Sequence, residues 1–237
     1  MTRRLKRLAA PRTWPIPRKG TKWVLRTAPG PHAQEESIPV ETVLRDVLHL
    51  ASTAREVRIL LNEKKVMIDG TVVKDPARGL GLMDVLSLGA PLSKHYRVLK
   101  SHLGKLYLLP IEASEAASKL ARVRFKSTVP GGKVALTLHD GRNLLVEAKS
   151  EYRTGDTLQL HVPDQKVVAR LPLAPDMLVY ISGGAHVGEM ARVERVEVIA
   201  ASQANRVHFK EGFSTIRDYA FVVGDKAPAV TLSEVVG

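Results

Sequence analysis

Cationic side chains gather at the start of the chain, where the chemistry they could perform is the binding of a polyanion. The first 26 residues hold nine Lys or Arg and no acidic residue, and so supply nine of the formal net charge of +12. Trp14 and Trp23 lie among these cations, and Pro11, Pro15 and Pro17 disfavour a helix. Cations beside rings on which bases can stack are typical of RNA binding. The pattern favours a nucleic-acid partner over a targeting peptide or a merely solvated arm.

The residue types that catalyse reactions form no recognisable cluster in the sequence. None of the eight His has another at i+4, and neither Asp84 nor Asp140 has an obvious partner for paired-carboxylate chemistry. Gly79 and Gly81 lack the third glycine of a dinucleotide loop, and Gly188 is not followed by the Lys-Ser/Thr of a phosphate loop. The chain has no Cys, which excludes disulfides, Cys-ligated zinc and a thiol nucleophile. We expect no enzyme, no catalytic residue, no cofactor, no metal and no small-molecule substrate.

Composition points to a folded chain with a basic extension. The apolar fraction is 44%, which is ordinary for a globular protein. No apolar run approaches the roughly 18 residues that cross a bilayer, so we expect no membrane partner and a cytoplasmic location. Residues 1–39 are Pro-rich and lack periodicity, which predicts an extended arm that is ordered only by a partner.

Two helices and a hairpin are expected to follow the arm. Apolar residues recur at helical spacing in 40–50 and again in 53–65. Thr53 and Glu56 fit a capping box at the start of the second helix. In 66–73, an Asp-Gly pair between β-branched residues predicts a tight β-turn.

Basic residues of this helix–helix–hairpin region join those of the arm as candidate RNA contacts. Acidic residues nearly match them in number, so an ordinary solvated surface remains an open alternative. The candidate RNA-binding residues are Arg3, Arg4, Lys6, Arg7, Arg12, Trp14, Arg18, Lys19, Lys22, Trp23 and Arg26 in the arm, and Arg45, Arg55, Arg58, Lys64, Lys65, Lys74 and Arg78 after it.

Beyond residue 91, short strand patterns separated by Gly turns predict small β-barrels. Helical character is confined to 112–121. In 179–199, a strand leads into Gly183, Gly184 and Gly188, an arrangement that fits an ordinary turn between strands.

Many short strings in one order resemble the archaeal branch of the S4e family of small-subunit ribosomal proteins. They are LKRLAAP (5–11), PGPH (29–32), SIPV (37–40), LRDVL (44–48), TAREVR (53–58), VMIDG (66–70), GLMDV (81–85), LHDGRN (138–143), TGDTL (154–158), ISGGAHVG (181–188) and TIRDYAFVVG (215–224). They extend over nearly the full length of the chain.

The resemblance implies a multi-domain α+β protein. It implies a basic extended N-terminal arm (1–39), a small helix–helix–hairpin RNA-binding module (40–91) like that of bacterial ribosomal protein S4, a central β domain (92–170) and a C-terminal KOW-type, SH3-like β-barrel (171–237). The KOW loop of such barrels is Gly-Gly-x-Asn-x-Gly-Arg-x-Gly, and here its Asn, Arg and last Gly positions hold His186, Glu189 and Ala191. RNA contact by this loop is therefore ranked below the arm and the module.

The expected function is that of a structural constituent of the small ribosomal subunit that binds and positions 16S rRNA, with neighbouring small-subunit proteins as further partners. The alternative is an RNA-modifying enzyme similar to a pseudouridine synthase, which would need a catalytic Asp in an Arg-Leu-Asp-like setting that this chain lacks. A KOW-bearing transcription elongation factor is disfavoured by the basic arm and the first module.

Overall fold

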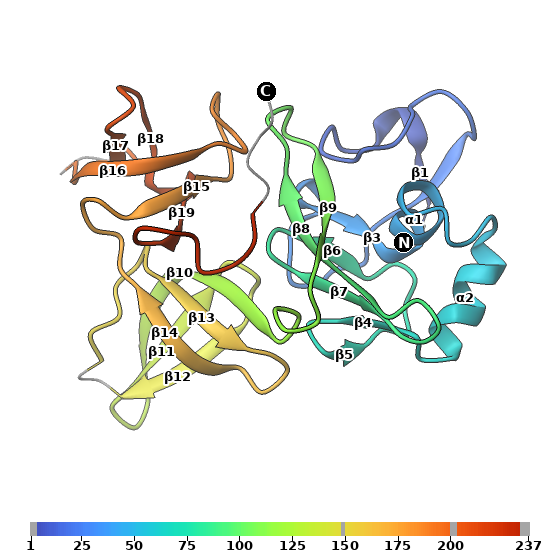
Figure 1. The fold of residues 1–237 in the computed structure, drawn as a ribbon, viewed down its shortest axis with the longest axis horizontal. Coiled ribbons are helices and arrows are strands. Elements are labelled where there is room, and N and C mark those ends of the chain that lie inside the picture. Colours follow the sequence, from blue (N-terminus) through green and yellow to red (C-terminus); the bar gives the residue numbers. More distant parts are fainter. Residues whose placement is uncertain (1–3, 148–149, 200–202, 233–237) are drawn as a thin grey trace. The chain divides into compact units, whose positions relative to one another are not determined.

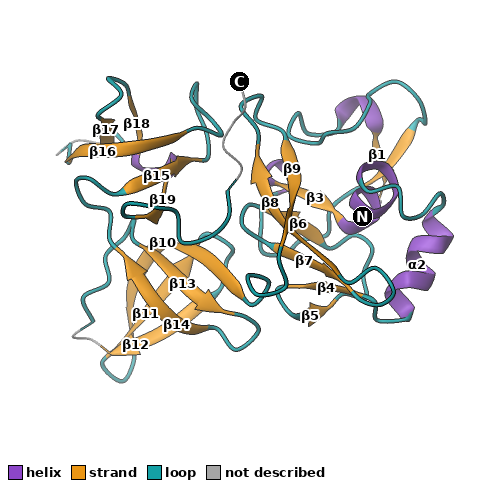
Figure 2. Ribbon diagram, in the orientation of Figure 1, coloured by secondary structure: helices purple, strands orange, loops and turns teal. Residues whose placement is uncertain are grey.

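The structure is a computed structural model that describes residues 4–147, 150–199 and 203–232. It divides into two compact units, Met1–Ala117 (unit 1) and Ser118–Gly237 (unit 2), each described by itself (Figure 1). Strands dominate both units, and the α-helices of the described residues are short and lie in unit 1 (Figure 2). Of the predicted multi-domain α+β fold, the multi-domain character is confirmed, and the chain is mostly β with few helices.

The N-terminal stretch of unit 1 is folded. Strand β1 (Arg4–Lys6) pairs antiparallel with β2 (Trp23–Leu25), and a 3-10 turn, η1 (Arg7–Ala9), follows β1. A second 3-10 turn, η2 (Gln34–Glu36), precedes β3. Apolar side chains of the stretch are buried in the same core as the two helices that follow it. The predicted extended arm is thus corrected, because these few apolar residues find a core to enter.

The two predicted helical regions are present and shorter than expected. Strand β3 (Ser37–Pro39), which pairs with β6 (Gly79–Gly81), leads into α1 (Val40–Thr42), and a π-helical turn, η3 (Val43–Val47), continues it. The second helix is α2 (Ala54–Asn62), whose apolar face is buried.

The predicted hairpin forms around Asp69 and Gly70, whose φ angles are 49° and 73°. It joins β4 (Val66–Ile68) to β5 (Thr71–Val72). Positive φ at both positions is what an Asp-Gly turn between twisted strands requires.

The sheet of unit 1 extends beyond the expected module boundary. Strands β7 (Val85–Leu88), β8 (Lys94–Lys100) and β9 (Leu106–Ile111) continue it in the order β5-β4-β7-β8-β9, with every pair antiparallel. The predicted division at residue 91 therefore falls inside one sheet, since the hydrogen bonds between β7 and β8 join its two sides.

Unit 2 begins with a long strand in place of a predicted helix. Residues 113–117 form turns, and β10 (Ser118–Val129) pairs along its first half with β13 (Thr157–His161) and along its second half with β11 (Lys133–Leu138). Pairing with β13 overrides the helical composition of residues 118–121, the end of the stretch expected to be helical. The outer strands are β12 (Asn143–Glu147) and β14 (Lys166–Leu171).

A second five-stranded sheet completes unit 2. It has the order β18-β17-β16-β15-β19 and its own apolar core. Its strands are β15 (Leu178–Ile181), β16 (Met190–Glu197), β17 (Arg206–Phe209), β18 (Ser214–Ile216) and β19 (Ala220–Gly224), with the 3-10 turn η4 (Arg217–Tyr219) before β19.

Among the described residues, no helix is long and apolar enough to cross a membrane.

Candidate nucleic-acid interface

Burial of Trp14 fixes the N-terminal stretch on unit 1. The indole is 2% exposed, and its Nε1 donates a hydrogen bond to the backbone oxygen of Ser37 at 2.6 Å. It shares a core with Ala10 and Val24. An enclosed ring offers no face to a base, so the prediction that Trp14 stacks on RNA is corrected. Trp23, which is 44% exposed, keeps its ring at the surface.

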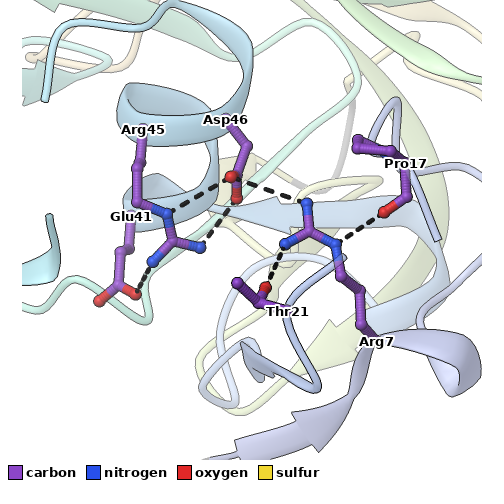
Figure 3. Close-up of polar contacts among 6 residues, drawn as sticks. All are labelled: Arg7, Pro17, Thr21, Glu41, Arg45 and Asp46. Atoms are coloured by element: carbon purple, nitrogen blue, oxygen red, sulfur yellow. Dashed lines mark hydrogen bonds and ion pairs between the residues drawn. The ribbon is translucent and has the colours of Figure 1, made fainter. Parts of the chain in front are cut away.

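Arg7 is also drawn into the fold. Its guanidinium donates from Nε to the backbone oxygen of Pro17 at 2.7 Å and from Nη1 to Thr21 Oγ1 at 2.8 Å (Figure 3). Its Nη2 lies 3.7 Å from Oδ1 of Asp46, a residue of the π-helical turn η3. Arg7 thereby links the N-terminal stretch to the helical module. Its side chain is buried, so a phosphate group cannot reach its guanidinium.

The same Asp46 binds Arg45 from the other side (Figure 3). Arg45 Nη2 lies 2.8 Å from Asp46 Oδ2, and Arg45 Nη1 lies 3.1 Å from Glu41 Oε1. The hydrogen bond to Asp46 raises the pKa of Arg45 above its ordinary value, against the opposing effect of burial. With Arg7, the cluster holds two cations and two anions, so its net charge is zero. We correct Arg7 and Arg45 from RNA contacts to structural ion pairs.

Other predicted cations stay at the surface. Arg18 is exposed, and its Nη1 donates to the backbone oxygens of Leu8 and Ala10 at 2.8 and 2.9 Å, which fixes its guanidinium. Lys65 pairs with Glu63 at 2.6 Å. Arg3 lies outside the described residues. Exposed cations whose side chains make no hydrogen bond or ion pair with another described residue are Arg4, Lys6, Arg12, Lys19, Lys22, Arg55, Arg58, Lys64, Lys74 and Arg78.

A groove concentrates several of these N-terminal cations. It has a volume of about 430 Å³ and is lined by Lys6, Arg7 and Leu8, at and just after the end of β1, and by residues 18–22, just before β2. Lys22 Nζ lies 5.6 Å from the centroid of the Trp23 ring, within the range of a cation–π contact. The pairing of β1 with β2 therefore brings together cations that are 11 or more residues apart in the sequence.

The start of α2 places two further arginines on an exposed helix face. Thr53 Oγ1 accepts a hydrogen bond from the Glu56 backbone N–H at 3.3 Å, and Glu56 Oε2 accepts one from the Ser52 N–H at 2.7 Å. This confirms the predicted capping box. Val57 and Leu61 point into the core, which leaves Arg55 and Arg58 at the surface on the other side.

Sequence reasoning missed cations in unit 2. Arg124 lies with its guanidinium carbon 5.1 Å from the centroid of Phe125, a ring that is 57% exposed on β10. Lys126 donates to the backbone oxygen of Tyr152 at 3.0 Å. The signal was an aromatic residue between two cations, the same signal that singled out Trp23.

The loop between β15 and β16 contains two of the three positions that depart from the KOW pattern, His186 and Glu189, and the third, Ala191, lies in β16. His186 Nδ1 lies 3.0 Å from Glu189 Oε2, and the His186 ring stacks on Phe213 at a centroid distance of 3.9 Å. Gly183 packs closely against the ring of Tyr219. A Cβ at this position would lie 2.8 Å from a ring carbon, so the close approach requires glycine. The acid that replaces the family cation is thus partnered inside its own loop.

Comparison with family models matches three consecutive parts of the chain. The RS4NT (NUC023) domain matches residues 1–35, the S4 domain residues 40–86, and Ribosomal family S4e residues 92–167. The chain is similar to the small ribosomal subunit protein eS4 of Methanosphaera stadtmanae, with 40% identity over 96% of this chain and 95% of that protein. It is also similar to the eS4 of Archaeoglobus fulgidus, with 40% identity over 93% of each.

A solved structure supports the same likeness. The crystal structure of the 30S ribosomal protein S4e from Thermoplasma acidophilum aligns with a TM-score of 0.70 and 32% identity, over 81% of this chain and 96% of that one.

Proposed function

Since the chain belongs to the ribosomal S4e family, we propose that it is a structural constituent of the small ribosomal subunit that binds and positions 16S rRNA. The family is one of structural ribosomal proteins and the chain is not an enzyme, so the RNA-modifying alternative is dropped. The protein acts in cytoplasmic ribosomes, where other small-subunit proteins are its neighbours. The observation that carries the proposal is the full-length similarity to two archaeal eS4 proteins.

The exposed cations indicate which parts of the chain contact RNA. The β1–β2 ribbon with its basic groove, together with the exposed face of α2, provides phosphate contacts. We assign residues 40–86, which match the S4 domain, to an S4-type RNA-binding module, and residues 171–237 to a KOW-type barrel. The partnered Glu189 makes the barrel loop a weaker candidate for RNA contact, because its carboxylate adds negative charge beside phosphates.

The proposed mechanism is electrostatic anchoring. Each Lys or Arg that contacts a phosphate displaces a condensed counterion, so the logarithm of the binding constant falls by about 0.7–0.9 per contact for each unit of log salt. Contacts of this kind orient a protein on RNA, exposed rings such as Trp23 offer a face for unpaired bases, and groups that hydrogen-bond base edges distinguish the bound nucleotides.

A salt titration with charge-matched variants tests this proposal. Filter binding of the full chain to transcribed 16S rRNA is measured across a KCl series. The variant Lys6→Gln/Lys19→Gln/Lys22→Gln should bind more weakly, with a slope reduced by about 2–3. The control Lys105→Gln/Lys166→Gln/Lys226→Gln removes equal charge at other exposed positions and should retain the wild-type slope. Equal effects of the two variants would reject the assigned surface, and no rRNA binding by the wild type would reject the function.

A further inference from the structure

A solvent-open hollow in unit 1 remains unexplained by the basic surface. It has a volume of about 580 Å³ and is lined by residues 26–34 together with Ala77. This volume lies within the roughly 300–1,000 Å³ of small-molecule sites, which combine apolar walls with a few polar groups. Pro29 and Pro31 supply rigid apolar rings, and Ala28, Ala33 and Ala77 keep the space open.

Two guanidinium groups at this hollow have unused hydrogen-bonding capacity. Arg26 uses only Nε, which donates to Gln34 Oε1 at 2.7 Å, and its two terminal nitrogens have no described partner. Arg78, whose Nη1 lies 3.9 Å from where a Cβ of Gly30 would be, also has no side-chain partner among the described residues. Guanidinium groups with free N–H donors beside apolar walls suit a ligand that combines a phosphate with an apolar ring.

The walls of the hollow are fixed before any ligand arrives. His32 Nε2 lies 3.0 Å from Asp84 Oδ2, and both side chains are 3% exposed. The ring packs so closely on Gly81 that a Cβ there would lie 2.2 Å from His32 Cγ. The Ala28 N–H donates to the backbone oxygen of Ala77, another lining residue, at 2.8 Å. A preformed hollow loses little conformational entropy when it is filled.

We propose that this hollow receives one unstacked nucleotide of the bound RNA. The base lies between the proline rings and the alanines, and Arg26 and Arg78 hold the adjacent phosphates. The hollow begins at Arg26, directly after β2, so it continues the cationic surface of the β1–β2 ribbon. An acidic peptide would use the arginines but not the apolar walls, whereas a nucleotide uses both. The inference rests on the proposed rRNA binding.

Two variants of the full chain test the hollow, one by filling it and one by removing a cation from its lining. Gly30→Phe adds a ring at a position where a Cβ meets nothing closer than 3.8 Å, and it should fill the space. Its control, Ala113→Phe, adds the same ring at an exposed position of unit 1. Arg26→Gln removes a guanidinium that the proposal assigns to phosphate, so it should weaken RNA binding and flatten the salt slope by about 0.7–0.9.

The readouts are filter binding to transcribed 16S rRNA and 2′-hydroxyl probing of the bound RNA. We expect Gly30→Phe to weaken binding with the wild-type salt slope, and Arg26→Gln to weaken binding with the flatter slope. Binding of wild type or of Ala113→Phe should change the 2′-hydroxyl reactivity of one nucleotide relative to free RNA. Binding of Gly30→Phe should leave the reactivity of that nucleotide unchanged. Wild-type affinity of both hollow variants would overturn the inference while leaving the proposed function intact. Normal rRNA binding by Gly30→Phe combined with failure to enter reconstituted particles would identify a protein occupant, and would overturn it too.

Discussion

Replacing Trp14 tests whether the N-terminal stretch is a structural part of unit 1. The side chain is 2% exposed, and its Nε1 donates to the backbone oxygen of Ser37. Burying an indole in a core contributes about 3–5 kcal/mol relative to Ala. With a urea m-value of about 2 kcal/mol/M, Trp14→Ala should move the unfolding midpoint of unit 1 down by about 2 M. Chemical unfolding followed by far-ultraviolet circular dichroism measures this shift.

Two matched substitutions separate ring burial from the lost hydrogen bond. Trp14→Phe keeps most of the apolar burial and removes the donor to Ser37, so it should cost about 1–3 kcal/mol. Trp23→Ala removes a ring that is 44% exposed and should cost far less. The units can unfold separately, so the transition of unit 2 should stay in place and serve as an internal reference. An unchanged midpoint for Trp14→Ala would refute the argument and restore the extended arm.

Three further outcomes follow from the described side chains. Arg55→Ala with Arg58→Ala should weaken rRNA binding across sequences and flatten the salt slope by about one unit per lost contact, and an unchanged slope would mark both as solvated surface. The hydrogen bonds that Glu56 accepts at the start of α2 lower its pKa, so their stabilisation is present above the ordinary carboxyl pKa and is lost as the pH falls through the lowered value. Amide exchange in α2 should show this acid sensitivity, and Glu56→Gln should abolish it. Glu189→Arg should leave rRNA binding unchanged or increase it, since it removes an anion from the loop, and a marked loss of particle assembly would instead place Glu189 against a cation of a neighbouring protein.

Local signals in the sequence were reliable where the interaction is itself local. The capping box needs only Thr53 and Glu56, three residues apart, and the hairpin turn needs only the adjacent Asp69 and Gly70. Both could be predicted because the residue types set the backbone geometry without help from the rest of the fold.

Features that depend on distant partners could not be predicted in this way. Trp14 looked like an RNA-stacking ring because its acceptor, Ser37, lies 23 residues away. Residues 118–121, the start of strand β10, looked helical because their pairing partner, β13, comes later in the chain. The boundary at residue 91 looked like a domain edge because the local sequence does not show that β8 pairs with β7 across it. In each case a contact absent from the local pattern overrode it.

Counting cations in the N-terminal stretch therefore overstates its contribution to RNA binding. Nine are present, but Arg7 is neutralised by Asp46 and Arg3 lies outside the described residues. The seven that remain exposed would give a salt slope of at most about −5 to −6. Arg7→Gln should accordingly lower the stability of unit 1 and leave the slope unchanged, whereas Lys19→Gln should flatten the slope by about 0.7–0.9 and leave stability unchanged. A flatter slope for Arg7→Gln would show that Arg7 contacts phosphate despite its burial, and charge count alone would then suffice to locate the interface.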